Sequence, residues 1–225
     1  VIDMKKEAGY DIDDLNPVIS INENRLWLFT RKGAPWGNSM AKFLEYAKAN
    51  PNTIRYMSGG AGGGMDSYVK FTQEQLNYTV DEIVVGPSQK RALMTAAGEG
   101  DFTVLPATSF IQHWQAGKVE VLMGSGPEKP EPPFETAVSS LQMGIKKDPF
   151  HQKMAFGVSP KTPVSHRDWL AKLLTAAAKD PSFIKKRESI PGLKVKVCQH
   201  DEAWQHSKDV MDFCEPMFKK LGIHY

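Results

Sequence analysis

A run of glycines between a predicted strand and a predicted helix constrains this chain more than any other feature. The run covers residues 58–64, after an extended segment at 53–57 and before a helix expected at 66–76. Glycine permits positive φ angles and lets another group come close to the backbone. Amide groups in such a turn, beside a helix N-terminus, favour negative charge. The pattern therefore predicts an anion site. Its residues are Ser58, Gly59, Gly60, Ala61, Gly62, Gly63 and Gly64.

Two nucleotide-binding signatures can be tested against this turn. A Walker A loop requires Lys after its last glycine, but Met65 follows Gly64. The dinucleotide pattern G-x-G-x-x-G also fails, because Met65 stands at its third glycine position after Gly60 and Gly62. The turn is thus predicted to bind an anion, although it carries neither nucleotide-binding signature. The alternative is a flexible turn with no ligand.

Composition limits the function classes. A chain of 225 residues can form one large domain or two small ones, and 41% hydrophobic with 24% charged residues is ordinary for a globular protein. A formal net charge of +2 gives no reason to expect a nucleic acid or an anionic membrane as a partner. No window of the sequence is apolar over the length needed to span a bilayer, so direct membrane insertion is not expected.

Short apolar strands alternate with amphipathic helices through much of the chain. Strands are expected at residues 53–57, 82–85, 102–105, 119–123, 154–158 and 193–198, and helices at 40–49, 66–76, 89–97, 106–116, 168–178 and 201–221. A long extended segment with a polar break, residues 17–30, precedes them. This alternation predicts a parallel, doubly wound α/β sheet. Residues 124–149, rich in Pro, Gly and Ser, indicate a surface excursion or a crossing between domains.

Ligands of such sheets bind beyond the carboxyl ends of the strands. Besides the glycine turn, the turn at 86–88 and the residues Thr108 and Ser109 follow predicted strands. We therefore expect Ser88, Gln89 and Thr108 to contribute to the same ligand site.

The two cysteines allow several interpretations. Cys198 ends a predicted strand and Cys214 lies in the helix that follows it, so a disulfide is expected if the compartment is oxidising. A metal site with His200 and His206 is an alternative, although the spacing fits no common zinc pattern. Two buried free thiols are the third interpretation.

Several segments of the chain together suggest a family. They are Asn-Pro-Val-Ile-Ser at 16–20, Ala-Lys-Ala-Asn-Pro at 47–51, Ile-Arg-Tyr-Met-Ser-Gly-Gly-Ala-Gly at 54–62, Ala-Gly-Lys-Val-Glu-Val-Leu at 116–122 and Phe-Gly-Val-Ser-Pro-Lys-Thr-Pro at 156–163. In order and spacing the set resembles the substrate-binding proteins of tripartite tricarboxylate transporters, the Bug-type periplasmic receptors. No single segment is very specific, but the set extends over nearly the whole chain.

The resemblance implies a periplasmic-binding-protein-like α/β fold, with a doubly wound α/β lobe and part of a second α/β lobe joined by hinge strands. The expected domains are a hinge-strand segment with a remnant of lobe 1 (1–32), lobe 2 (33–147), and a return strand with the C-terminal part of lobe 1 (148–225). The resemblance also implies a periplasmic protein that holds a small carboxylate through backbone amides, hydroxyls and waters, without a cofactor, and works with membrane transporter subunits.

The chain departs from the family pattern in three places. Asp66 stands where family members usually carry His, and residues 86–90, Gly-Pro-Ser-Gln-Lys, replace the usual Pro-Tyr-Lys-Gly-Gly segment. The family also begins with a block that this chain lacks, so one lobe is expected to be incomplete. The apolar stripes of that lobe are then expected to face water in part. Two such stripes are Trp169, Leu173 and Ala177, and Val210, Phe213 and Met217. Self-association, a local rearrangement or weak ligand binding would follow.

Two other functional classes compete with a transport receptor. A ligand-sensing receptor coupled to a signalling partner would bind the same kind of molecule. A hydrolase would use Ser58 as its nucleophile, but no G-x-S-x-G elbow surrounds Ser58, and His113 is a lone histidine near the Thr108 turn. We therefore expect no enzymatic activity.

A few side chains carry two interpretations each. Trp36, Phe110 and Trp114 could stack on an aromatic ligand, or pack in the core as aromatic residues usually do. Lys90 and Arg91 could attract a carboxylate, or form a solvated helix face. Arg55, just before the glycine turn, is similarly ambiguous.

Overall fold

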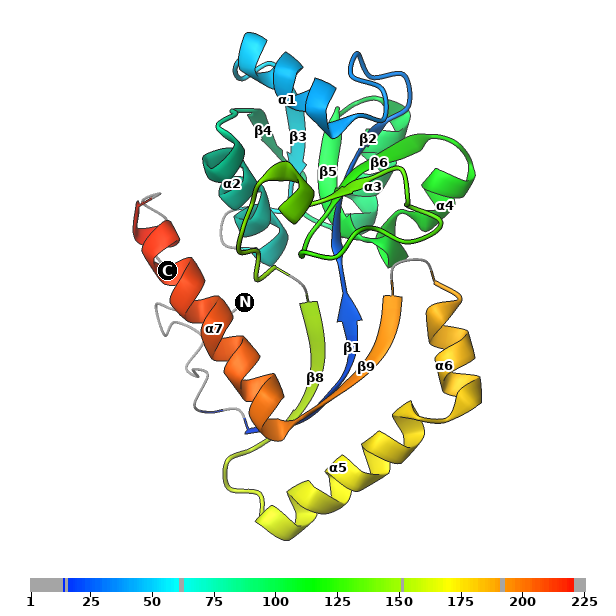
Figure 1. The fold of residues 1–225 in the computed structure, drawn as a ribbon, viewed down its shortest axis with the longest axis vertical. Coiled ribbons are helices and arrows are strands. Elements are labelled where there is room, and N and C mark those ends of the chain that lie inside the picture. Colours follow the sequence, from blue (N-terminus) through cyan, green and yellow to red (C-terminus); the bar gives the residue numbers. More distant parts are fainter. Residues whose placement is uncertain (1–13, 15, 61–62, 151, 191–192, 221–225) are drawn as a thin grey trace. The chain divides into compact units, whose positions relative to one another are not determined.

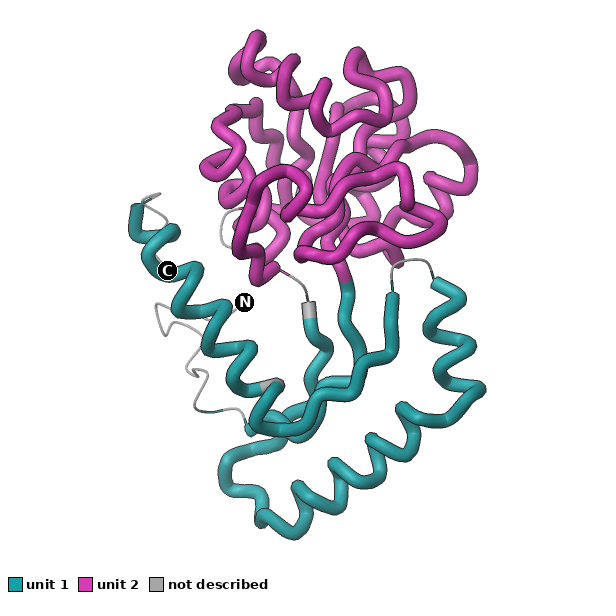
Figure 2. Tube along the Cα trace, in the orientation of Figure 1, with its two compact units in different colours: residues 1–24, 152–225 teal, residues 25–151 magenta. Residues whose placement is uncertain are grey.

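The computed structural model describes residues 14, 16–60, 63–150, 152–190 and 193–220 (Figure 1). The chain divides into two compact units (Figure 2): unit 1 combines Val1–Asn24 with Gln152–Tyr225, and unit 2 is Arg25–His151. The sequence places the boundaries after residues 32 and 147 instead. The difference arises because the segment after Asn24 forms a strand of the sheet in unit 2.

Unit 2 is built around a six-stranded sheet with the order β4-β3-β5-β2-β6-β7. Its elements are β2 (Leu26–Arg31), α1 (Met40–Ala49), β3 (Arg55–Ser58), α2 (Gly64–Leu76), β4 (Asp81–Val84), α3 (Ser88–Ala97), β5 (Phe102–Pro106), η2 (Ala107–Ser109), α4 (Ile111–Gln115), β6 (Val119–Gly124), β7 (Val138–Ser139) and η3 (Leu141–Met143). The segment 124–149, expected to be a surface excursion or a crossing between domains, contributes the short strand β7 to the sheet.

The sheet of unit 2 is mixed, whereas the sequence predicts a parallel one. β3 runs parallel to β4 and β5, and β6 runs parallel to β7. β2 lies between β5 and β6 and is antiparallel to both. The expectation of a wholly parallel sheet was wrong for β2, because this strand directly continues β1 past Arg25 rather than returning through a crossover helix.

Helices cover both faces of this sheet. Successive residues of a strand point to opposite faces. Phe102 of β5 packs against Phe43 of α1, with ring centroids 5.3 Å apart. Leu105 of the same strand belongs to a core cluster on the other face, with Ala92 of α3 and Phe110. This two-sided packing confirms the doubly wound α/β class.

Unit 1 contains a three-stranded antiparallel sheet with the order β8-β1-β9. Its elements are β1 (Asn16–Asn24), β8 (Gln152–Val158), α5 (Val164–Ala178), α6 (Pro181–Glu188), β9 (Leu193–Gln199) and α7 (His200–Lys220). Val18, Ile19 and Ile21 of β1 form its core together with Ala178 of α5.

Helix α6 has no counterpart among the predicted helices, although its start signal is present in the sequence. The carboxylate of Asp180 accepts hydrogen bonds from the amides of Ser182 and Phe183, and Pro181 occupies the first helical position. The helix is short and only partly buried, so its apolar periodicity is weak. Capping chemistry therefore marks this helix better than hydrophobic pattern does.

The expected disulfide is not formed, and Cys198 and Cys214 are free and buried. Cys214 lies about 20 Å along α7 from His200, since a helix rises about 1.5 Å per residue. Cys198 precedes that helix by only two residues, on β9. A bridge requires Cα atoms about 4.4–6.8 Å apart. The prediction was wrong because the helix itself carries Cys214 away from the end of the strand.

Candidate functional site

The glycine turn, the Gly86 turn and Thr108 lie at one edge of the sheet in unit 2. β4, β3 and β5 are neighbours in the sheet and parallel, so their carboxyl ends meet at the same edge. The amides of Val85 and Gly86 both donate to the carbonyl oxygen of Ser58, across 2.9 and 3.2 Å. Thr108 follows β5 in η2 and is exposed. Ala61 and Gly62, the centre of the glycine turn, lie outside the described residues.

An internal carboxylate occupies part of the glycine turn. Oδ1 of the buried Asp66 accepts hydrogen bonds from the Tyr56 hydroxyl (2.5 Å), the Ser58 hydroxyl (2.8 Å) and the Gly59 amide (2.9 Å). The Gly60 amide donates to Ser58 Oγ across 2.9 Å. The sequence predicts that these amides are available to an external anion. The structure shows that those of Gly59 and Gly60 are already used within the protein.

The close approach of Asp66 explains two of the glycines. A Cβ atom on Gly59 would lie 2.9 Å from Asp66 Oδ2, and one on Gly63 would lie 2.8 Å from the same atom. Neither position can therefore carry a side chain without displacing the carboxylate. Burial and the Asp66 charge together raise the pKa of Tyr56 well above its usual value, which keeps its hydroxyl a donor.

Ser58 also contacts a second carboxylate. Its Oγ lies 2.7 Å from Glu82 Oε1, and Lys70 Nζ lies 2.5 Å from Glu82 Oε2. Burial raises the pKa of Glu82, but the hydrogen bonds from Lys70 and Ser58 outweigh it and lower the pKa overall. Because a hydroxyl carries one proton, Ser58 can donate to only one of the two carboxylates at a time. This fully buried hydroxyl belongs to an internal network rather than to an exposed nucleophile.

Two helix N-termini meet this edge of the sheet without side-chain caps. α2 begins after Gly63 and α3 begins after Pro87, and among the residues that the structure describes neither helix has a side-chain cap. The first N–H groups of a helix have no partner within it, and the helix dipole favours negative charge there. The first residue of α2, Gly64, is exposed, as is Gln89 of α3. This edge can therefore receive an anion through backbone amides.

The three basic residues considered from the sequence have different environments. Lys90 is exposed on α3, whereas its neighbour Arg91 is buried, so the interpretation as a solvated face was wrong for Arg91. Arg55 lies at the opposite end of β3 from the glycine turn and pairs with Asp101, with Nε 3.0 Å from Oδ2. Arg55 is therefore part of a structural ion pair and not of this edge.

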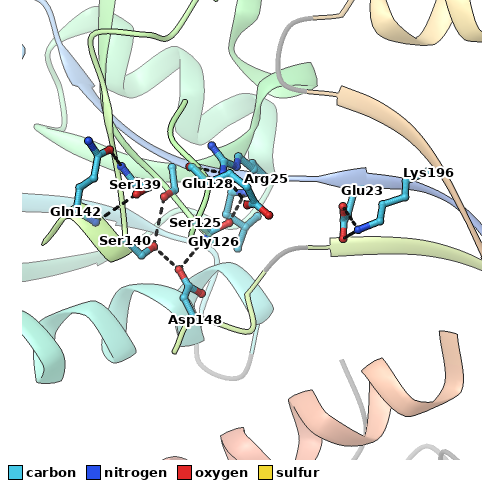
Figure 3. Close-up of polar contacts among 12 residues, drawn as sticks. Glu23, Arg25, Ser125, Gly126, Glu128, Ser139, Ser140, Gln142, Asp148 and Lys196 are labelled. Atoms are coloured by element: carbon cyan, nitrogen blue, oxygen red, sulfur yellow. Dashed lines mark hydrogen bonds and ion pairs between the residues drawn. The ribbon is translucent and has the colours of Figure 1, made fainter. Parts of the chain in front are cut away.

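A second polar cluster lies at the same edge and has no counterpart in the sequence analysis (Figure 3). β6 runs in the same direction as β5, because β2 is antiparallel to both. Just beyond β6, the Gly126 amide donates to Asp148 Oδ2 across 2.9 Å, and the Ser140 hydroxyl donates to the same oxygen. Ser140 Oγ also lies 3.2 Å from the Tyr68 hydroxyl of α2. Asp148 is hard to foresee because the segment around it shows no periodic pattern.

Figure 3 also shows further polar contacts, in each unit separately. Arg25 pairs with Glu128 across 2.9 Å in unit 2, and the Ser139 amide donates to the side chain of Gln142. In unit 1, Lys196 pairs with Glu23 across 3.1 Å. The Lys196–Glu23 pair connects the neighbouring strands β9 and β1.

The aromatic candidates lie in the core or pack against it. Trp36 and Phe110 are buried, and Trp36 donates from its indole nitrogen to Thr30 Oγ1 across 3.1 Å. Trp114 packs edge to face against Phe134, with ring centroids 5.3 Å apart. The core interpretation is thus confirmed for Trp36 and Phe110, whereas Trp114 is partly buried and packs against the core cluster. His113 is half-buried on α4.

The described ranges hold neither a metal-binding cluster nor a membrane-spanning helix. They contain no group of three or more His, Cys, Asp or Glu side chains that could hold a metal ion. They also contain no helix that combines the length and the apolar character needed to cross a bilayer.

Solved structures show the same fold. An R. palustris protein with adipate superimposes with a TM-score of 0.82 at 19% identity, over 95% of this chain and 71% of that one. The periplasmic binding protein BugD superimposes with a TM-score of 0.79 at 19% identity, over 93% of this chain and 70% of that one. MatC from Rhodopseudomonas palustris with bound malate superimposes with a TM-score of 0.74 at 15% identity, over 95% of this chain and 72% of that one.

Comparison with curated proteins gives no match. The family model described as tripartite tricarboxylate transporter family receptor, in contrast, matches residues 3–223, which is almost the entire sequence. The chain therefore belongs to the tripartite tricarboxylate transporter receptor family, as its sequence motifs indicate.

Proposed function

We propose that this protein is a periplasmic solute-binding receptor that captures a small carboxylate and delivers it to a tripartite tricarboxylate-type membrane transporter. Family membership over residues 3–223 supports the receptor role. Two structures of the same fold contain the carboxylates adipate and malate. The observation in this chain that carries the proposal is the meeting of two uncapped helix N-termini at one sheet edge.

The proposed ligand site is the edge formed by the carboxyl ends of β3, β4 and β5. The described parts of the glycine turn, 58–60 and 63–64, follow β3, and Ser88, Gln89 and Thr108 follow β4 and β5. Because Gly59 and Gly60 already donate within the protein, the amides at the start of α2 are the better candidates for the ligand. Gly64 is exposed there, and within the described ranges α2 has no side-chain cap that would compete for these donors. Backbone amides with a helix dipole bind a carboxylate without requiring a cofactor.

A thermal-shift screen followed by calorimetric titration tests the proposal. Adipate, malate and succinate are suitable probes, with their uncharged diamides as controls. We expect at least one diacid to raise the melting temperature and to bind, since a ligand that binds only the folded state stabilises it. The diamide should bind much more weakly. The diacid should also be recovered chemically unchanged after prolonged incubation. Turnover of the probe, or equal binding of acid and amide, would contradict the proposal.

A further inference from the structure

Arg91 is a buried cation beside the glycine turn, and most of its donors lack an acceptor. The residue is 4% exposed, and its Nε and Nη1 atoms are buried with no hydrogen-bond partner within the described ranges. Nη2 donates to Ser88 Oγ across 3.2 Å and to Met65 Sδ across 3.3 Å. A thioether sulfur is a weak acceptor, and a guanidinium stays charged at any physiological pH.

No carboxylate of the described residues accepts a hydrogen bond from Arg91. Asp66 is a carboxylate on the other side of Gly59. The Cβ position of Gly59 would be 2.9 Å from Asp66 Oδ2 and 3.3 Å from both Cζ and Nη2 of Arg91, so the two side chains flank this glycine. Oδ1 of Asp66 already accepts the bonds from Tyr56, Ser58 and Gly59.

This arrangement is energetically unusual for a purely structural arginine. A buried charge is costly unless it is paired and hydrogen-bonded. Arg55, by contrast, directs Nε and Nη2 at both carboxylate oxygens of Asp101. Arg91 lies in the first turns of α3, where side chains point back toward the helix N-terminus. Its charge therefore adds to those of two helix dipoles at the same edge.

We propose that Arg91 forms a bidentate pair with a carboxylate group of the ligand. The carboxylate would replace the weak acceptor Met65 Sδ and supply acceptors to the nitrogen atoms that lack them. Planar guanidinium and carboxylate groups match each other through two parallel hydrogen bonds, which are stronger than bonds between neutral groups. This inference rests on the proposed function and adds a charged side chain to a site otherwise made of amides and hydroxyls.

The test compares Arg91→Gln with Lys90→Gln, which removes the same charge from the exposed neighbouring position of α3. Affinities for adipate, malate and succinate are measured by calorimetry, and urea unfolding is measured for each variant. We expect Arg91→Gln to weaken binding of the tightest diacid about 10- to 100-fold, as loss of a charge-assisted bidentate pair implies. Lys90→Gln should change it less than about threefold. Arg91→Gln should unfold at the same or a higher urea concentration, because it removes a costly buried charge.

A second comparison uses the monoamide of the tightest diacid. If Arg91 pairs with that carboxylate, Arg91→Gln and the monoamide should each weaken binding, and their combination should weaken it little further. Arg91→Lys keeps the charge without the planar fork and should fall between wild type and Arg91→Gln. Three outcomes would each overturn the inference. Arg91→Gln could bind with near-normal affinity, or its effect and that of the monoamide could be additive. The third outcome is that Arg91→Gln is destabilised while its folded fraction binds normally. If wild type binds none of the diacids, the proposed function itself fails, and this inference with it.

Discussion

The backbone amide of Gly59 donates to Oδ1 of Asp66 across 2.9 Å. A carboxylate of the protein thus uses an amide that the glycine turn would otherwise offer to a ligand. Tyr56 and Ser58 donate to the same oxygen, so this atom holds the end of β3 to the first turn of α2. The glycine turn therefore has a partly structural role, and the amides that remain for a ligand are those at the start of α2.

Asp66→Ala should destabilise unit 2 substantially. The change leaves the buried Tyr56 hydroxyl and the Gly59 amide without their acceptor, whereas Ser58 can still donate to Glu82. The expected loss in unfolding free energy is about 2–4 kcal/mol. Asp66→Asn keeps an oxygen acceptor and should cost less. Tyr56→Phe removes one donor alone and should cost about 1 kcal/mol. Urea unfolding measures all three.

The double variant Tyr56→Phe with Asp66→Ala provides the control for this network. Its loss should be smaller than the sum of the single losses, because neither change then leaves the other partner unsatisfied. A loss equal to that sum would show that Tyr56 and Asp66 do not interact in solution.

The sequence allowed prediction of the α/β class and of the sheet edge that carries the candidate site. Glycine turns and apolar strands reveal both, because they depend on local backbone conformation and on burial. The antiparallel direction of β2 could not be foreseen, since strand direction depends on which end of the sheet the chain enters. The separation of Cys198 from Cys214 could have been foreseen, because a helix predicted over 201–221 already places Cys214 far from the end of the strand.

Side-chain partners were the least predictable part of the site. Arg91 and Lys90 are adjacent in the sequence, yet one is buried and the other exposed. Their difference depends on the rotation of α3 against the sheet, which a short helix with a weak apolar stripe does not determine. Asp66 is similar, because its role depends on the distance between β3 and the start of α2.

Asp101 should stabilise the fold in a pH-dependent way. It accepts hydrogen bonds from the Arg31 side chain and from the backbone and side chain of Arg55. Burial raises the pKa of Asp101, but these hydrogen bonds outweigh it and lower the pKa below its usual value. The stabilisation is therefore present above the unfolded pKa, about 3.9. It is lost as the pH falls from there through the folded pKa.

We expect Asp101→Asn to cost about 1–3 kcal/mol at pH 7, with a deficit that shrinks as the pH falls below about 4. Urea unfolding at several pH values measures this. Glu120→Gln, which breaks the surface pair with Lys32, serves as the control and should cost less than about 1 kcal/mol. A deficit for Asp101→Asn that stays constant between pH 7 and pH 3 would contradict the ion-pair explanation.

Cys198 and Cys214 should both titrate as free thiols once the protein unfolds. In the folded protein both are buried, and burial raises the pKa of Cys214 to about 11, so little thiolate forms at pH 8. We expect slow reaction with a thiol reagent in buffer. In denaturant without reductant, reaction should be rapid at both residues. Cys198→Ser should leave one reactive group, which assigns the signal. An absence of reactive thiols in denaturant would mean that the two residues are bridged.

The exposed apolar side chains of α5 should promote self-association. Trp169 and Leu173 are one helical turn apart and are 62% and 51% exposed, in agreement with the expectation that this stripe faces water in part. Burying them against a second copy would remove apolar surface from water at both partners. We therefore expect the average mass from light scattering to rise with protein concentration.

The double variant Trp169→Gln with Leu173→Gln should reduce that rise, whereas Lys172→Gln, at an exposed polar position of the same helix, should not. Unfolding free energy should change by less than about 0.5 kcal/mol in both variants, because surface substitutions rarely do more. A wild-type protein that remains monomeric throughout the concentration series would show that this stripe does not drive association.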